Sequence, residues 1–218
     1  MSVSKTAGTE IVCVEANIGA GKSTVLEKLS KRYKDDDGVT ILLEPVDEWL
    51  KGGFLKMASE CASKRAAFQH AVLVSITTRL VAALQTRPRM ILMERSPWSN
   101  LHVFAQANLK GEDLNLYKYT FRNMIGLLPA GVSFHFILLD LEVPLLEERI
   151  KARGRNVEKM LTTDYLQKLN KLHKDWFEKI QWYGKQWHLD ASVSPEDVFE
   201  SVYSITERVS RPPATEVC

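Results

Sequence analysis

Short apolar segments alternate with long amphipathic segments along this chain. Five short runs are mostly apolar at both odd and even positions, at residues 11–14, 39–43, 90–93, 134–139 and, more weakly, 187–189. Such runs are typical of parallel strands that helices cover on both faces. The pattern therefore predicts five parallel strands.

The segments between these runs are long enough for crossover helices, which we expect at 21–33, 58–85, 161–183 and 195–209. In the second of them, apolar residues recur at every fourth position from Phe68 to Leu84. The alternation of strands and helices predicts an α/β fold with one five-stranded parallel sheet. We expect a single domain over 1–218, with frayed ends at 1–9 and 210–218.

A glycine-rich segment follows the first predicted strand. Gly21, Lys22 and Ser23 match the end of the pattern G-x-x-x-x-G-K-[ST], while Ala16 replaces its first glycine. Backbone N–H groups of such a loop surround phosphates, the lysine adds charge, and the hydroxyl is suited to Mg²⁺. We predict an ATP site at Ala16, Asn17, Ile18, Gly19, Ala20, Gly21, Lys22, Ser23 and Thr24.

Polar residues follow the other predicted strands. Glu44 lies after the second strand, and Glu94 and Arg95 lie at the end of the third. Ligands of open α/β sheets bind beyond the carboxyl ends of the strands, so these side chains are expected to converge with Lys22. A basic cluster of Arg149, Arg153 and Arg155 follows the fourth strand.

Composition narrows the class of protein. Lys and Arg number 29 against 27 Asp and Glu, so the chain lacks the basic excess of a nucleic-acid-binding protein. No signal peptide and no apolar run close to a membrane span are recognised, which predicts a cytoplasmic protein without a membrane partner. The three cysteines form no C-x-x-C and the histidines form no cluster, so we expect no zinc site.

In order and spacing, these motifs resemble the deoxyribonucleoside kinase family. The resemblance covers about residues 11–190. It rests on N-I-G-x-G-K-S-T at 17–24, E-P-V at Glu44 with Trp49, F-Q at 68–69, E-R-S at 94–96, R-G-R-N-x-E at 153–158, and 165–166 with 172–176. It implies a P-loop kinase fold with an arginine-rich lid near 150–161, ATP and Mg²⁺ as cofactors, and a homodimer.

The resemblance also implies catalytic roles. Glu44 takes or orients the proton of the sugar 5′-hydroxyl, and Arg95 lies beside that oxygen and the incoming phosphoryl group. Lys22 binds the phosphates. Glu94 joins Ser23 as a Mg²⁺ ligand, although it competes with Glu44 for the role of base.

Other residues are implied to bind the substrates. Gln69 pairs with the base edge, Trp49, Met57 and Phe104 form the walls, and Glu158 accepts from the 3′-hydroxyl. The lid arginines are Arg149, Arg153 and Arg155, and the loop after Asp190 holds adenine. Structural interpretations stay open beside these roles. Gln69 fits a helix surface, Trp49 and Phe104 fit a core, Glu44 fits a strand-end cap, and Arg149 fits an ion pair with a neighbouring glutamate.

The chain departs from the family pattern at several positions. Ala16 replaces a glycine, Ala58 a frequent tyrosine, and Thr162 a common proline. Ile76 and Asn100 stand where members that prefer cytosine or guanine carry arginine and aspartate. We count Ile76 and Asn100 among the substrate-binding residues. Because they offer no charged pair, we expect thymidine and deoxyuridine as good substrates, deoxycytidine as a possible one, and purines as poor ones.

The sequence thus predicts a kinase that moves the γ-phosphoryl group of ATP to the 5′-hydroxyl of a deoxynucleoside in deoxynucleotide salvage. Two alternatives stay open. One is a thymidylate-type monophosphate kinase, and the other is a non-catalytic scaffold subunit that has kept the P-loop fold.

Overall fold

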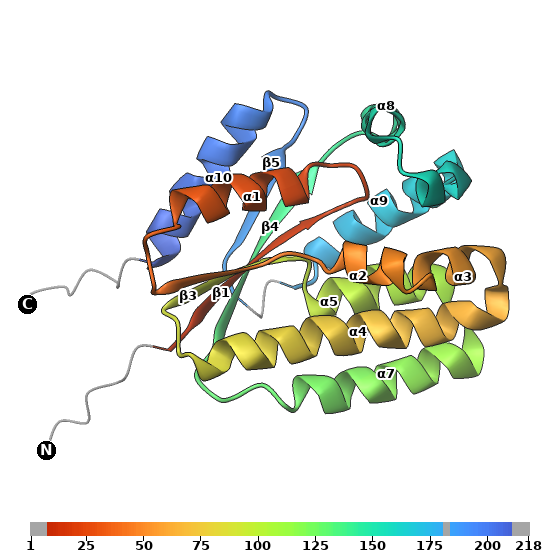
Figure 1. Ribbon diagram of the computed structural model, residues 1–218, viewed down its shortest axis with the longest axis horizontal. Coiled ribbons are helices and arrows are strands. Elements are labelled where there is room, and N and C mark those ends of the chain that lie inside the picture. Colours follow the sequence, from red (N-terminus) through yellow and green to blue (C-terminus); the bar gives the residue numbers. More distant parts are fainter. Residues whose placement is uncertain (1–7, 181–183, 211–218) are drawn as a thin grey trace, which may run out of the picture.

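The computed structural model describes residues 8–180 and 184–210, and the chain runs through alternating strands and helices (Figure 1). The expectations for residues 1–7 and 211–218 lie outside this part. The strands are β1 (Glu10–Ala16), β2 (Val39–Leu42), β3 (Met90–Glu94), β4 (Ser133–Asp140) and β5 (Gln186–Asp190). The longer helices are α1 (Lys22–Arg32), α4 (Ala62–Gln85), α7 (Gly111–Ile125), α8 (Val143–Arg153), α9 (Thr163–Phe177) and α10 (Pro195–Ser210).

Short helices connect these elements near one end of the sheet. They are α2 (Val46–Lys51), α3 (Phe54–Glu60), α5 (Pro97–Ser99), the π-helix η1 (Asn100–Ala105), α6 (Gln106–Asn108) and the 3₁₀-helix η2 (Asn156–Met160).

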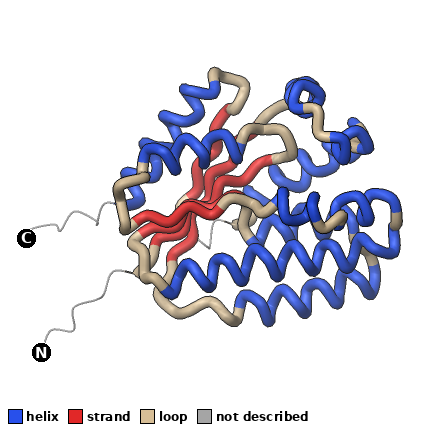
Figure 2. The backbone as a smooth tube through the Cα atoms, in the orientation of Figure 1, coloured by secondary structure: helices blue, strands red, loops and turns tan. Residues whose placement is uncertain are grey.

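The strands form one parallel sheet in the order β2-β3-β1-β4-β5. Figure 2 shows this sheet in red, with helices around it. The five predicted strands and the α/β fold are confirmed. All carboxyl ends lie at the same edge of a parallel sheet, so the residues that follow the strands meet there.

Helices cover the sheet on both faces, with α1 and α10 on one and α4, α5 and α7 on the other (Figure 1). In β1, Ile11 and Cys13 pack into the core on the α4 side, while Val12 and Val14 pack into the core on the α1 side. Side chains of a strand alternate between faces, so a strand buried on both is apolar at every position.

Two predicted helices have different bounds in the structure. The helix expected at 58–85 is divided, because Cys61 has extended backbone angles between α3 and α4. The helix expected at 161–183 is α9, which ends at Phe177. Its first turn is capped by the Thr162 hydroxyl, which accepts a hydrogen bond from the Tyr165 amide at 3.2 Å. Thr162 therefore starts this helix without the proline common in the family.

Helix α4 is more apolar than the sequence analysis supposed. Its segment Lys64–Gln85 is long and apolar enough, by length and composition, to cross a membrane. In the structure it packs against α3, α7 and η1, and 39% of the apolar window is buried. Part of its apolar surface is thus covered inside the fold, whereas Val74 stays exposed.

Candidate active site

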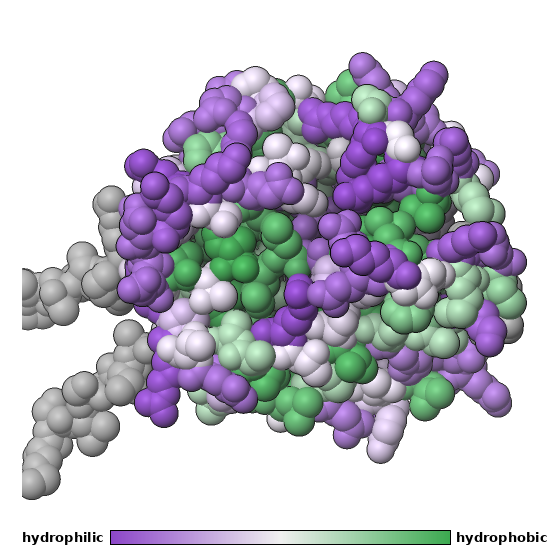
Figure 3. All heavy atoms as spheres, in the orientation of Figure 1, coloured by the Kyte–Doolittle hydropathy of each residue, from purple (hydrophilic) through white to green (hydrophobic). Residues whose placement is uncertain are grey.

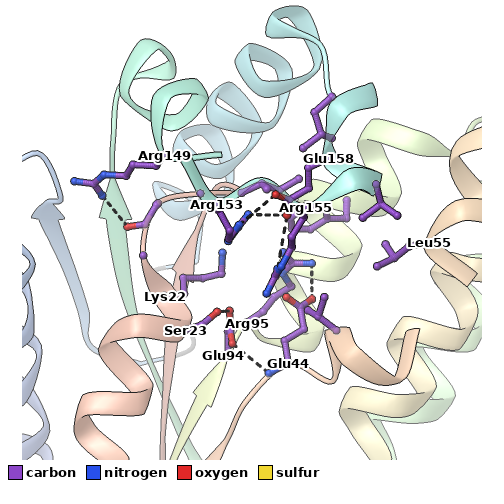
Figure 4. A pocket seen from close by; sticks show the side chains of 18 of the residues that line it. Lys22, Ser23, Glu44, Leu55, Glu94, Arg95, Arg149, Arg153, Arg155 and Glu158 are labelled. Atoms are coloured by element: carbon purple, nitrogen blue, oxygen red, sulfur yellow. Dashed lines mark hydrogen bonds and ion pairs between the residues drawn. The ribbon is translucent and has the colours of Figure 1, made fainter. Parts of the chain in front are cut away.

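A cavity of about 940 Å³ lies beyond the carboxyl ends of the strands. One part of its wall is the loop between β1 and α1, with the segment around η2 and the loop after β5. The other part comes from α2, α3, α4 and η1. Figure 4 shows Glu44 and Arg95 pointing toward each other where the two parts meet, with Lys22 on the phosphate-loop side of them. The structure therefore joins the predicted phosphate site to a second, more apolar compartment.

The loop between β1 and α1 has the backbone of an anion site. Gly19 and Gly21 have φ of 87° and 100°, which favours glycine. A Cβ at Gly19 would also lie 2.8 Å from Ile150 of α8. Ala16 is the last residue of β1 and is buried, and it is not among the described residues with positive φ. The methyl group in place of glycine is thus accommodated as strand.

The Lys22 ammonium is held inside this loop. Its Nζ donates to the carbonyl oxygens of Ala16 and Asn17, both at 3.1 Å. Burial lowers the pKa of Lys22, and nearby Arg95 lowers it further, while Glu94 and Glu44 raise it. Phosphate oxygens are stronger acceptors than these carbonyls, so the ammonium is poised to exchange partners.

Two oxygen groups of the kind that ligate Mg²⁺, those of Ser23 and Glu94, lie next to the lysine. The Ser23 hydroxyl donates to Glu94 Oε1 at 2.8 Å, and Glu94 Oε2 accepts from the Glu44 amide at 3.3 Å. The described residues contain no group of three or more His, Cys, Asp or Glu that would form an all-protein metal cage. Mg²⁺ needs no such cage, since it commonly takes one or two protein oxygens together with phosphate oxygens. Ser23 and Glu94 fit that ion.

Glu44 and Arg95 form a buried ion pair at the centre of the cavity. Arg95 Nη1 lies 2.8 Å from Glu44 Oε1, and the two side chains are 10% and 7% exposed. The Arg95 guanidinium also lies over the Phe104 ring, 3.7 Å from its centroid. Glu44 Oε1 and Arg95 Nε have no well-aligned hydrogen bond within the described chain. Both atoms therefore have capacity for a polar group of a ligand.

The charge state of Glu44 depends on its surroundings. Burial raises the pKa of its carboxyl, Arg95 opposes that shift, and Glu94 adds to it. A carboxylate with a raised pKa is a better proton acceptor than an exposed one. Glu44 therefore suits the role of base better than that of a strand-end cap.

Gln69 lies in the apolar compartment. It is 6% exposed, lines the cavity, and its Oε1 has no hydrogen-bond partner in the described structure. The surrounding wall contains Trp49, Phe68, Val72 and Phe104. A buried amide without a partner indicates a ligand that supplies one. The interpretation of Gln69 as a helix-surface residue is wrong.

Three predicted substrate-binding residues do not line the cavity: Met57, Ile76 and Asn100. Ile76 is buried in the core, because Val72, one turn earlier on α4, occupies the cavity wall. Asn100 starts the π-helix and is fully buried, and neither atom of its amide has a partner among the described groups. The apolar wall that we expected at Ile76 is supplied by Val72.

The basic cluster pairs with Glu158 and with the backbone. Arg153 donates to both oxygens of Glu158, at 2.7 and 3.2 Å, and Arg155 lies 3.6 Å from the same carboxylate. Arg149 instead donates to the carbonyl oxygen of Ala191 at 3.0 Å and to that of Ala20 at 3.4 Å. It thus ties the phosphate loop to the loop after β5.

Sequence reasoning gave no role to several polar residues of the wall, among them Tyr165 and Asn108. The Asn108 amide donates to the Tyr165 hydroxyl at 2.8 Å, which leaves the phenol proton available to a further acceptor. Tyr165 belongs to one of the sequence motifs, which was a signal for it. Asn108 lies in α6, directly after the π-helix η1, which no sequence periodicity predicts. Residues of the predicted adenine loop, Ala191 and Val193, also line the cavity.

Comparison with known proteins adds independent evidence. A family model described as deoxynucleoside kinase matches residues 12–210. The thymidine kinase of Ictalurid herpesvirus 1 is 28% identical over 202 residues, which cover 89% of this chain and 85% of the relative. A protein of Fowlpox virus named "Probable deoxycytidine kinase" is 26% identical over 174 residues, with coverage of 77% and 72%.

A solved structure shows the same fold. It is the deoxyadenosine kinase from M. mycoides, with dCMP and a flexible dCDP bound as products. The TM-score is 0.76 at 22% identity, over 91% of this chain and 99% of the other. The relatives and this neighbour carry the names of different nucleosides, so their names leave the base open.

Proposed function

Because the chain belongs to the deoxynucleoside kinase family and is an ATP-dependent kinase of that family, we propose that it phosphorylates pyrimidine deoxynucleosides on the 5′-hydroxyl, in deoxynucleotide salvage. The observation that carries this proposal is the cavity, which joins the phosphate loop to the buried amide of Gln69. The Glu44–Arg95 pair lies between them, where a 5′-hydroxyl would meet the γ-phosphate.

Charge and position account for the chemistry. In phosphoryl transfer, negative charge spreads over the oxygens of the moving group, so cations placed in advance stabilise the transition state. Lys22 and Arg95 supply two such cations from the buried part of the site. Glu44 exchanges its partner Arg95 for the substrate hydroxyl, aims that hydroxyl at phosphorus and takes its proton.

Ser23 and Glu94 would hold the Mg²⁺ that accompanies ATP, through their hydroxyl and carboxylate oxygens. When bound, the ion supplies charge neutralisation at the phosphate oxygens. In this assignment Glu94 orients the nucleotide and Glu44 handles the proton.

We propose that the segment with Arg153, Arg155 and Glu158 acts as a lid. Glu158 pairs with both arginines in the structure. A sugar 3′-hydroxyl that donates to Glu158 would compete for its oxygens, and the guanidinium groups would then turn to the phosphates of ATP. Binding of the nucleoside thereby prepares the lid for the transfer step.

For the lid, we expect Arg153→Ala to lower kcat by about tenfold or more while the dissociation constant of the nucleoside changes little, because this cation acts on charge in the transition state. Steady-state kinetics and nucleoside titration measure the two effects. Arg208→Ala is the control, since Arg208 is exposed on α10 and does not line the cavity. Loss of nucleoside affinity with unchanged kcat would contradict the lid assignment.

The wall around Gln69 favours pyrimidines. The Gln69 amide presents a donor beside an acceptor. In one orientation it pairs with N3–H and O4 of thymine, and after rotation it pairs with N3 and the exocyclic amine of cytosine. Trp49 and Phe104 offer aromatic surfaces to the ring. Val72 adds an apolar wall beside Gln69 on α4, and burial of the thymine methyl group there contributes about 0.8 kcal/mol.

We therefore expect kcat/KM to rank thymidine and deoxyuridine above deoxycytidine, and all three above purine deoxynucleosides. Ribonucleosides rank lower still, because their 2′-hydroxyl would be buried without a partner. Coupled ATP turnover with each nucleoside measures the series, and Gln69→Leu should remove activity on every base. A purine deoxynucleoside with kcat/KM above that of thymidine would contradict the base preference and leave the kinase assignment intact.

We also propose a homodimer through α4 and α7. These helices pack side by side at the outside of the fold, and Figure 3 shows hydrophobic (green) surface scattered over this region. Their exposed apolar side chains include Val74, Leu116 and Tyr119. Covering such a face with a second copy removes apolar surface from water. Sedimentation velocity should give twice the chain mass, and Leu116→Glu should give the monomer. A wild-type monomer at every concentration would contradict this proposal.

A further inference from the structure

Arg95 reaches the reacting end of the cavity from an unusual backbone conformation. Its φ is 62°, and Arg87 is the other non-glycine residue with positive φ within residues 8–180 and 184–210. An L-residue with a side chain adopts this conformation at a cost, and it persists where the surroundings over-determine it. Specific contacts must therefore hold Arg95.

Two hydrogen bonds fix the backbone around Arg95. Its own N–H donates to the carbonyl oxygen of Val14 at 3.1 Å. The next N–H, that of Ser96, lies beyond the last pair of the β1–β3 ladder and donates instead to Glu15 Oε1 at 2.8 Å. A side-chain carboxylate thus takes the place of a backbone acceptor.

Glu15 is an unexpected residue for a fully buried position. It is 0% exposed, it lies on the same face of β1 as Cys13, and it does not line the cavity. Its second oxygen, Oε2, has no hydrogen-bond partner in the described structure. Burial raises its pKa, while the hydroxyls of Ser96 and Ser99 and the charge of Arg95 oppose that shift. A buried carboxylate is costly compared with an apolar side chain, so packing alone does not account for Glu15.

We infer that Glu15 is a positioning residue, whose carboxylate fixes the peptide between Arg95 and Ser96 and so aims the Arg95 guanidinium at Glu44 and the moving phosphoryl group. The inference rests on the proposed role of Arg95. Glu15 does not contact the substrates, and it acts on the reaction through Arg95.

Two conservative variants separate the position of the acceptor from its charge. Glu15→Gln keeps an oxygen at the same reach, whereas Glu15→Asp keeps the charge and withdraws the oxygen by one methylene group. We expect kcat of Glu15→Gln to stay within about threefold of wild type, and kcat of Glu15→Asp to fall by about tenfold or more with nucleoside KM little changed. Cys13→Ala is the control for a change in the same buried face that leaves Arg95 untouched.

A double-mutant cycle tests the route of the effect. Glu15→Asp should cause no further loss of kcat in an Arg95→Ala background, because its effect passes through the missing guanidinium. An equal loss in both backgrounds, wild-type kcat for Glu15→Asp, or a Glu15→Gln enzyme as slow as Glu15→Asp would overturn the inference. If Arg95→Ala alone kept wild-type kcat, the proposed role of Arg95 would fail instead.

Discussion

Glu44→Gln is expected to lower kcat by about 10²–10⁴-fold, the usual contribution of a general base, while nucleoside binding is largely kept. The amide has the shape of the carboxylate but does not take a proton. Glu44 Oε1 lies 2.8 Å from Arg95 Nη1, and both side chains are nearly buried. Water therefore has little access to replace the carboxylate as the proton acceptor. Single-turnover transfer from labelled ATP, together with nucleoside titration, measures both quantities.

The pH profile gives a second measurement on the same residue. Glu44 accepts a proton only when it is ionised, and burial raises its pKa. We expect kcat/KM to fall as the pH drops through a pKa above the usual carboxyl range, and Glu44→Gln to lack this acid limb.

Two variants serve as controls for Glu44. Glu48→Gln removes an exposed carboxylate from the neighbouring helix α2, where it pairs with Arg79, and should leave kcat unchanged. Glu94→Gln tests the competing assignment. If Glu44→Gln kept normal kcat and Glu94→Gln did not, Glu94 would be the base.

Lys22→Met is expected to lower kcat by about 10²–10³-fold, the scale for removing one preorganised group that stabilises developing charge. The methionine fills the volume of the lysine stem, so the loop keeps its packing. The lost ammonium is the cation that lies inside the phosphate loop, on the carbonyl oxygens of Ala16 and Asn17. Nucleoside affinity should change little, because we propose that the nucleoside binds in the other compartment.

Lys31→Met is the matched control for Lys22, since Lys31 is exposed at the far end of α1. Its kcat should equal that of wild type. A Lys22→Met enzyme with wild-type kcat and raised KM for ATP alone would show that the lysine contributes equally to binding and to the transition state.

The elements of the fold that are buried on both faces were the most predictable. Strands β1 and β4 contain unbroken apolar runs, at residues 11–14 and 136–139, and this pattern has one simple explanation in an α/β protein. Helices near the sheet end were less predictable. Cys61 interrupts a continuous helical pattern that contains no Gly or Pro. The π-helix at Asn100–Ala105 has no sequence periodicity that would predict it.

The candidate site shows the same limit. Motif positions next to strand ends, such as Lys22, Glu44 and Arg95, do converge, because the sheet topology alone brings them together. The position of Ile76 depended on the rotation of α4 about its axis, and the structure turns Val72 to the cavity instead. The role of Glu15 was not predictable from the sequence, because its partner, the Ser96 amide, is brought to it only by the fold.

The central claim is that the acceptor is the neutral 5′-hydroxyl of a deoxynucleoside held against Glu44. The most direct measurement is transfer of the γ-phosphate of labelled ATP to thymidine and, separately, to thymidine monophosphate, with the products identified. In the reaction with thymidine, we expect labelled thymidine 5′-monophosphate. In the reaction with thymidine monophosphate, we expect no labelled diphosphate. Label on the monophosphate with none on thymidine would contradict the account and indicate a monophosphate kinase.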